Sequence, residues 1–71
     1  MDLPEVTRRE QDVLDLLALG KTNEEIGAAL GVRPGTAKAH VSNLLEKTGY
    51  KNRTQLATWW QENKARYVPK D

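Results

Sequence analysis

The residues of this sequence that could take part in chemistry are cations, amides and hydroxyls, and the net positive charge is concentrated in the middle third of the chain. Between positions 32 and 54, five basic residues stand against one acidic residue, a net charge of +4. Positions 1 to 31 carry three basic and seven acidic residues, a net charge of −4. An electropositive segment beside an acidic one is typical of a single surface that faces a polyanion, and a solvated helix face can also produce it.

The same inventory argues against an enzyme and against a metal site. The chain has one histidine, His40, and no cysteine, and its carboxylates follow no ligand spacing. A nucleophile, a base and an orienting group cannot be assembled from such a set, and neither can a structural zinc site. We therefore expect binding rather than catalysis, with no cofactor and no metal.

Length and composition indicate one small globular domain. The chain has 71 residues, of which 38% are hydrophobic and 30% charged. No apolar run approaches the ~20 residues that span a bilayer, and the acidic start of the chain does not look like a secretion signal. The absence of cysteine fits a reducing compartment. We expect a cytoplasmic domain without membrane contact, stabilised by packing and helix caps.

Helix signals recur along the chain, so the elements that position the polar side chains are helices. Three helix starts are marked by a capping residue followed three positions later by Glu or Gln: Thr7 with Glu10, Thr22 with Glu25, and Asn52 with Gln55. Pro34 suits the first turn of a further helix. The predicted fold class is all-α, a small four-helix domain with helices at about 7–19, 22–30, 34–48 and 52–63. The core spans about 4–63, and we expect the polar tail 64–71 to fray.

The connection between the second and third predicted helices indicates a helix-turn-helix. Only Gly31, Val32 and Arg33 separate them, and helices joined by so short a turn cross steeply. Gly27, in the middle of the second helix, would let the two backbones approach, whereas a glycine there otherwise costs about 1 kcal/mol relative to alanine. A three-helix bundle with no nucleic-acid ligand can contain such a turn as well.

The third predicted helix has two different faces. One carries an apolar stripe, including Val41 and Leu44, that should pack on the first two helices. The other combines small residues with one lysine, which suits a helix that lies against base edges in a DNA major groove. Lysine can donate to guanine, an alanine methyl can contact thymine, and serine or asparagine can donate or accept. The predicted base-reading residues are Lys38, Ala39, Ser42 and Asn43.

Candidate phosphate contacts surround this face. Free N–H groups at helix starts, with hydroxyl, amide and cationic side chains nearby, can bind phosphate oxygens. Two of these residues have an alternative role that involves no phosphate: Thr22 can serve as a helix cap alone, and His40 can pack at the margin of the core. The predicted phosphate contacts are Thr22, Asn23, Arg33, Thr36, His40, Lys47, Lys51 and Arg53.

The fourth predicted helix carries the candidate dimer surface. Leu56 and Trp60 should enter the core, whereas Trp59 could cover the core edge or join an interface. The remaining side is a stripe of small and polar residues on which a second helix could rest, and a plain solvent face explains it equally well. The residues of this stripe are Thr54, Ala57, Thr58 and Gln61.

Four separated blocks resemble the LuxR-type helix-turn-helix family, also called GerE-like or NarL-like. They are Thr7-Arg8-Arg9-Glu10-x-x-Val13-Leu14, Gly20-x-Thr22-Asn23-x-Glu25-Ile26, Thr36-x-Lys38-x-His40-Val41-Ser42-Asn43-Leu44-Leu45-x-Lys47, and Asn52-Arg53-Thr54-Gln55. The resemblance covers about residues 4–63. It implies the DNA-binding output domain of a transcriptional regulator, with the third helix in the major groove of double-stranded DNA. It also implies a homodimer, paired through the fourth helix over an inverted repeat.

Within this resemblance, Lys38, Ala39 and Ser42 fall where such domains read bases. Thr36, His40 and Lys47 match positions near the DNA backbone. Two positions at the start of the recognition helix depart from the family pattern: Arg33 stands where a serine or threonine usually caps the helix, and Ala37 where a branched apolar residue is usual. Arg33 cannot cap. The position of Ala39 often holds valine and that of Ser42 varies, so the sequence preference cannot be carried over from the family.

Two other functions fit parts of the pattern. Pro34-Gly35-Thr36 and the opening Thr-x-Arg-Glu are similar to region four of sigma factors, which reads promoters and docks on RNA polymerase. A helical protein-interaction or dimerisation module without DNA binding is the alternative from a different class. The LuxR-type resemblance further implies control by a receiver or ligand-sensing domain that this chain does not contain, and leaves RNA polymerase as a candidate partner.

Overall fold

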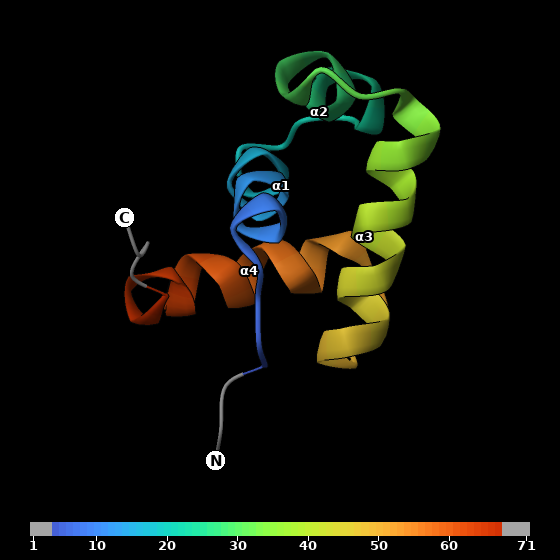
Figure 1. Cartoon of the computed structure of the whole chain (residues 1–71). Helices are drawn as coiled ribbons and strands as arrows, with labels where there is room; N and C mark the ends of the chain where they lie inside the picture. Colours follow the sequence, from blue (N-terminus) through green and yellow to red (C-terminus); the bar gives the residue numbers. More distant parts are fainter. Residues whose placement is uncertain (1–3, 68–71) are drawn as a thin grey trace.

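The fold is known from a computed structural model of the chain, which describes residues 4–67. Its elements are α1 (Arg8–Ala18), α2 (Asn23–Leu30), α3 (Pro34–Thr48), α4 (Arg53–Asn63) and the short 3-10 helix η1 (Lys64–Arg66) (Figure 1). No strand occurs within residues 4–67. The all-α prediction with four helices is confirmed, and each predicted helix boundary lies within one residue of the observed one.

The helix starts follow their capping residues. Thr7 Oγ1 accepts from the Glu10 N–H at 3.1 Å while Glu10 Oε1 accepts from the Thr7 N–H at 2.9 Å. Thr22 and Glu25 repeat this reciprocal pair at the start of α2. At α4 the pair is only half formed, because the Asn52 side chain caps the Gln55 N–H but the Gln55 side chain accepts from the Lys51 N–H.

The start of α3 has no side-chain cap. Arg33 occupies the cap position with extended backbone and makes no capping hydrogen bond, and Pro34 begins the helix. Proline suits this place because it has no N–H to leave unpaired. As expected from the departure at Arg33 from the family pattern, α3 begins without a side-chain cap.

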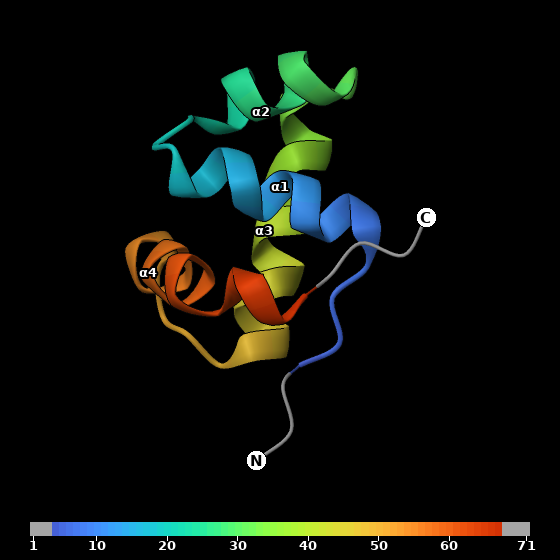
Figure 2. The same ribbon diagram turned by 90° about the vertical axis from the view of Figure 1, so that its left-hand side faces the viewer.

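The hydrophobic core lies where α1 contacts all three other helices (Figure 2). Its members come from every helix: Val13, Leu14, Leu17, Ile26, Ala37, Val41, Leu44, Leu56, Trp59 and Trp60. Leu56 and Trp60 enter this core as predicted. Trp59 is only 8% exposed and lies against the rings of Tyr50, Trp60 and Tyr67, so it covers the edge of the core.

The crossing of α2 and α3 depends on a glycine. A Cβ atom on Gly27 would lie 2.6 Å from the carbonyl oxygen of Val32, closer than real Cβ contacts. Gly31 ends α2 at φ +72°, in the left-handed region that favours glycine. Close backbone approach, the predicted reason for Gly27, is confirmed, and the backbone that approaches Gly27 is the turn of Val32 and Arg33 together with the first nitrogen of α3.

The chain after α4 does not fray over residues 64–67. η1 follows α4 directly, and the Tyr67 hydroxyl donates to the Pro4 carbonyl oxygen at 2.7 Å. The Tyr67 ring centroid lies 5.3 Å from that of Trp60 and 5.8 Å from that of Trp59. The expectation of a frayed tail is wrong for these residues, because aromatic packing holds them against the core. The rest of that expectation, 68–71, lies outside the described residues.

Within the described chain, no helix has the length and apolar composition needed to cross a membrane.

Candidate nucleic-acid interface

The outer face of α3 is the first part of the candidate interface. α3 runs along one edge of the molecule, with α2 at its first turns and α4 crossing its lower half (Figure 1). Ala37, Val41 and Leu44 turn toward the core. The predicted base-reading residues Lys38, Ala39, Ser42 and Asn43 are all exposed. Because 3.6 residues make one turn, Ala39, Ser42 and Asn43 lie on the side of α3 opposite its buried stripe, and Lys38 lies at the edge of this outer face, about 90° around the helix from the stripe.

The predicted phosphate contacts lie around this face but do not form one cluster. Thr22 and Asn23 begin α2, whereas Arg33 and Thr36 begin α3. His40, in the middle of α3, is half-buried. The remaining three, Lys47, Lys51 and Arg53, lie in the last turn of α3, in the following loop and at the start of α4.

Arg53 joins the starts of α2 and α4. Its Nη1 donates to Asn23 Oδ1 at 3.0 Å, and its Nη2 donates to the Lys21 carbonyl oxygen at 2.7 Å. Within the described part of the chain, α2 packs on α1 and α3 but not on α4. The Arg53 side chain is thus a bridge between two helices that do not otherwise pack together, and it brings two predicted phosphate contacts into direct contact with each other.

Lys47 joins the last turn of α3 to the first turn of α1. Its Nζ lies 2.7 Å from Glu10 Oε1 and 3.0 Å from Oε2. The Lys47 side chain is 35% exposed and that of Glu10 only 12%. Burial raises the pKa of the Glu10 carboxyl, but the hydrogen bonds from Lys47 and Thr7 and the charge of Lys47 outweigh it, so the pKa lies below its ordinary value. The structure therefore gives Lys47 an intramolecular partner that the sequence did not predict.

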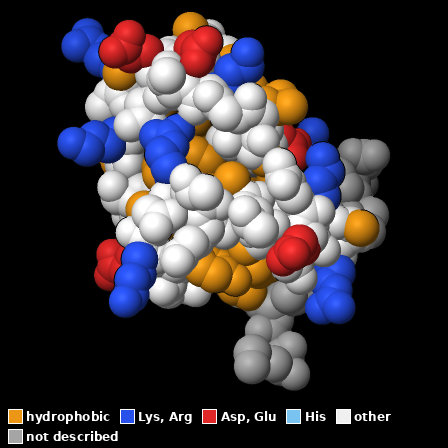
Figure 3. All heavy atoms as spheres, turned by 180° about the vertical axis from the view of Figure 1, so that it is seen from behind, with side chains coloured by type: hydrophobic (Ala, Val, Ile, Leu, Met, Phe, Trp, Pro, Cys, Tyr) orange, Lys and Arg blue, Asp and Glu red, His pale blue; other side chains and the backbone are white. Residues whose placement is uncertain are grey.

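The predicted dimer stripe lies along α4. Thr54, Thr58 and Gln61 are exposed and Ala57 is half-buried. Gln61 Nε2 donates to the Ala18 carbonyl oxygen at 3.1 Å, so one end of the stripe is tied to α1. The view of the molecule from behind shows hydrophobic side chains near the middle of that face, with most of the charged side chains nearer its margin (Figure 3).

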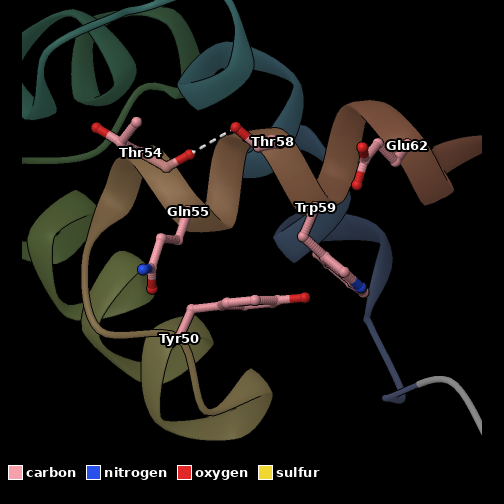
Figure 4. Close-up of a pocket in the computed structure, with 6 residues that line it drawn as sticks. All are labelled: Tyr50, Thr54, Gln55, Thr58, Trp59 and Glu62. Carbon is pink, nitrogen blue, oxygen red and sulfur yellow. Dashed lines mark hydrogen bonds between the residues drawn. The ribbon is translucent and has the colours of Figure 1, made fainter.

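A shallow pocket lies beside the stripe. In Figure 4 the Tyr50 ring lies under α4 and the Trp59 side chain extends to the same side. Thr54 and Thr58 belong both to the stripe and to the pocket wall. The full lining is Tyr50, Thr54, Gln55, Thr58, Trp59 and Glu62. The sequence analysis did not assign Tyr50, Gln55 and Glu62 to the dimer surface, because no helical spacing in the sequence connects them to the predicted stripe.

No group of three or more His, Cys, Asp or Glu side chains within residues 4–67 is arranged to hold a metal ion. The interface consists of hydroxyls, amides and cations, which can donate hydrogen bonds to anionic oxygens and to base edges.

Comparison with known proteins identifies the family. The sequence model described as "Bacterial regulatory proteins, luxR family" matches residues 4–60. The chain is 55% identical over 53 residues to the uncharacterized transcriptional regulatory protein YhcZ of Bacillus subtilis. It is 43% identical over 58 residues to the transcriptional regulatory protein LiaR of the same organism. It is 38% identical over 58 residues to the nitrate/nitrite response regulator protein NarL of Escherichia coli.

These matches cover 75%, 82% and 82% of this chain, but only 25%, 28% and 27% of YhcZ, LiaR and NarL. The chain therefore spans about a quarter of the length of these relatives. The family consists of DNA-binding transcriptional regulators, which confirms the prediction of binding rather than catalysis. The chain belongs to the LuxR family of bacterial regulatory proteins, and it is a LuxR-type helix-turn-helix DNA-binding domain.

Proposed function

We propose that this domain reads a specific DNA sequence by placing α3 in the major groove. The observation that carries the proposal is the outer face of α3, where Lys38, Ala39, Ser42 and Asn43 are exposed together. Small side chains let the helix axis lie close to the base pairs, and Lys38 supplies a donor for guanine O6 and N7. A helix face that served only solvation would carry long charged side chains along its length.

Around α3, contacts to the DNA backbone hold the helix in register. The start of α2 offers N–H groups beside the Thr22 hydroxyl. The start of α3 offers mainly the Thr36 hydroxyl, because Pro34 has no N–H and the N–H groups of Thr36 and Ala37 donate to the Arg33 carbonyl oxygen. Arg33 directly before α3 and Lys51 shortly after it are exposed cations, and His40 within α3 can donate a hydrogen bond to a phosphate oxygen. Such contacts position a protein on DNA without reading its sequence.

We further propose that two copies pair through α4 over an inverted repeat. The stripe Thr54, Ala57, Thr58 and Gln61 is compatible with close helix packing, and the pocket beside it has an apolar wall formed by Tyr50 and Trp59. A single domain of this size makes few phosphate contacts. Linking two half-sites about one helical turn apart would raise the affinity without any new type of contact.

The whole protein is proposed to act in the cytoplasm as a regulator with a second, controlling domain. The relatives are about four times longer than their matched segments, and NarL is named as a response regulator. A receiver or ligand-sensing domain would control access to DNA, and RNA polymerase is the proposed downstream partner.

The test is selection from a randomised duplex pool with the wild-type chain and with Lys38→Glu. Enrichment of an inverted repeat by the wild type and its loss in the variant would support both proposals. Enrichment of one half-site only would support α3 reading and contradict pairing. Salt-sensitive binding without enrichment would contradict sequence reading, and absence of binding at low salt would favour the protein-interaction module.

A further inference from the structure

The two bridged cations of this domain, Lys47 and Arg53, have partners of different charge. Lys47 is bonded to a carboxylate, so its positive charge is compensated inside the domain. Arg53 is bonded to an amide oxygen and a backbone carbonyl oxygen, both neutral. Within residues 4–67, no ion pair includes Arg53. Its guanidinium is therefore oriented without being neutralised.

The geometry of Arg53 suits a phosphate group. A guanidinium has five N–H donors in a planar fork, and the two bonds to Asn23 and Lys21 leave donors free on the same rigid group. Arg53 and Asn23 are each the first residue of a helix, α4 and α2, and free N–H groups lie beside them. A side chain already held in place loses less conformational entropy when it binds a phosphate.

We infer that Asn23 is a positioning residue, which acts on DNA through Arg53, and that Arg53 binds a phosphodiester of the DNA backbone. The inference rests on the proposed DNA binding and changes the sequence prediction in two ways. Asn23 orients the phosphate-binding group and does not contact phosphate itself. Lys47, whose charge Glu10 compensates, serves to fix the end of α3 against α1 and contributes little to phosphate binding.

The experiment measures binding to a fluorescein-labelled duplex of mixed sequence over a series of salt concentrations. Mixed sequence suffices, because phosphate contacts carry no base preference. The proteins are the wild type, Asn23→Ala, Arg53→Gln and the double variant. Lys47→Gln is the matched control, since it removes the same charge from a lysine bonded to a carboxylate. Thermal unfolding of each variant gives the folded fraction at the assay temperature.

Arg53→Gln is expected to weaken binding roughly tenfold and to lower the slope of log affinity against log salt by about 0.9, the value for one lost phosphate contact. Asn23→Ala leaves the charge unchanged and is expected to weaken binding roughly threefold in the wild type. In the Arg53→Gln background the same change should have almost no effect, because there is no guanidinium left to orient. Lys47→Gln should keep the wild-type salt slope per folded molecule.

Three results would overturn the inference. An unchanged salt slope in Arg53→Gln would show that Arg53 does not contact phosphate. An equal loss from Asn23→Ala in both backgrounds would show that Asn23 acts on DNA by itself. If Lys47→Gln lowered the salt slope as much as Arg53→Gln, the charge of the intramolecular partner would not decide whether a cation of this domain is available to phosphate. Wild-type protein that binds no duplex at low salt would instead overturn the proposed function, and this inference with it.

Discussion

The two ends of α3 are fixed to other helices, whereas its outer face between them is exposed. At the start, Gly27 of α2 lies against the turn that precedes α3. At the last turn, Lys47 is bonded to Glu10 of α1. Between these points Lys38 faces outward, with no ion pair to any residue in the described range 4–67. Lys38 and Lys47 are the same residue type on one helix, so position and partner decide which of them can meet DNA.

The start of α3 should be the most sensitive region. Gly27→Ala is expected to destabilise the domain by roughly 2 to 3 kcal/mol, because the added methyl group meets a backbone oxygen that cannot move without opening the crossing. Urea unfolding measures this loss. Ala28→Ser, on the exposed side of α2, is the control and should change stability by less than about 0.5 kcal/mol. Wild-type stability in Gly27→Ala would mean that the start of α3 is not fixed by this contact.

The last turn of α3 should be the next most sensitive. Glu10→Ala removes the reciprocal cap at the start of α1 and leaves Lys47 without its carboxylate, and we expect a loss of about 2 kcal/mol. Glu46→Ala, an exposed carboxylate in the same part of α3, is the control and should stay within about 0.5 kcal/mol. Equal losses of stability in Glu10→Ala and Glu46→Ala would contradict the claim that the Lys47–Glu10 contact fixes the last turn of α3.

Acid should selectively weaken the contact between Glu10 of α1 and Lys47 in the last turn of α3. The folded pKa of Glu10 is lowered, so its contribution to stability is present above the unfolded value of about 4.3 and is lost as pH falls through the folded pKa. Glu25, whose pKa is lowered by its hydrogen bonds with Thr22, contributes in the same direction. Unfolding followed below about pH 5 should therefore show a shallower loss for Glu10→Gln than for the wild type. Parallel curves would contradict this role for Glu10.

The exposed face of α3 should tolerate change with almost no effect on folding. Ser42→Ala is expected to alter stability by less than about 0.5 kcal/mol, since the side chain is exposed and alanine favours a helix. The same variant should change relative affinity among duplexes that differ at a single base pair. Thermal unfolding and competition binding, done on one preparation, separate the two effects. A large loss of stability would show that Ser42 serves the fold.

Much of the architecture was predictable because its causes are local. Thr7 and Thr22 lie three residues before their reciprocal glutamates, and the start of α3 is marked by Pro34 alone. Gly27 was predictable for the same reason: the short turn after α2 requires a residue without a side chain close by. Spacing within a few residues carries all of this information.

The partners of the cations were not predictable, because they depend on how distant segments pack. Lys47 and Glu10 are 37 positions apart, and Arg53 and Asn23 are 30 apart. The order of residues 64–67 likewise depends on Tyr67 reaching rings on α4, a contact that no local pattern indicates. Sequence reasoning therefore identified the charged residues near the interface and could not tell which charges are already compensated.

The central claim is that the exposed face of α3 reads bases through Lys38. The most direct measurement compares wild type and Lys38→Ala on the duplex recovered by selection and on a duplex of mixed sequence, at one salt concentration. We predict a loss of about 1 to 3 kcal/mol on the selected duplex and a clearly smaller loss on mixed sequence. An equal loss on both duplexes would reduce Lys38 to a phosphate contact, and no loss on either would contradict base reading by this face of α3.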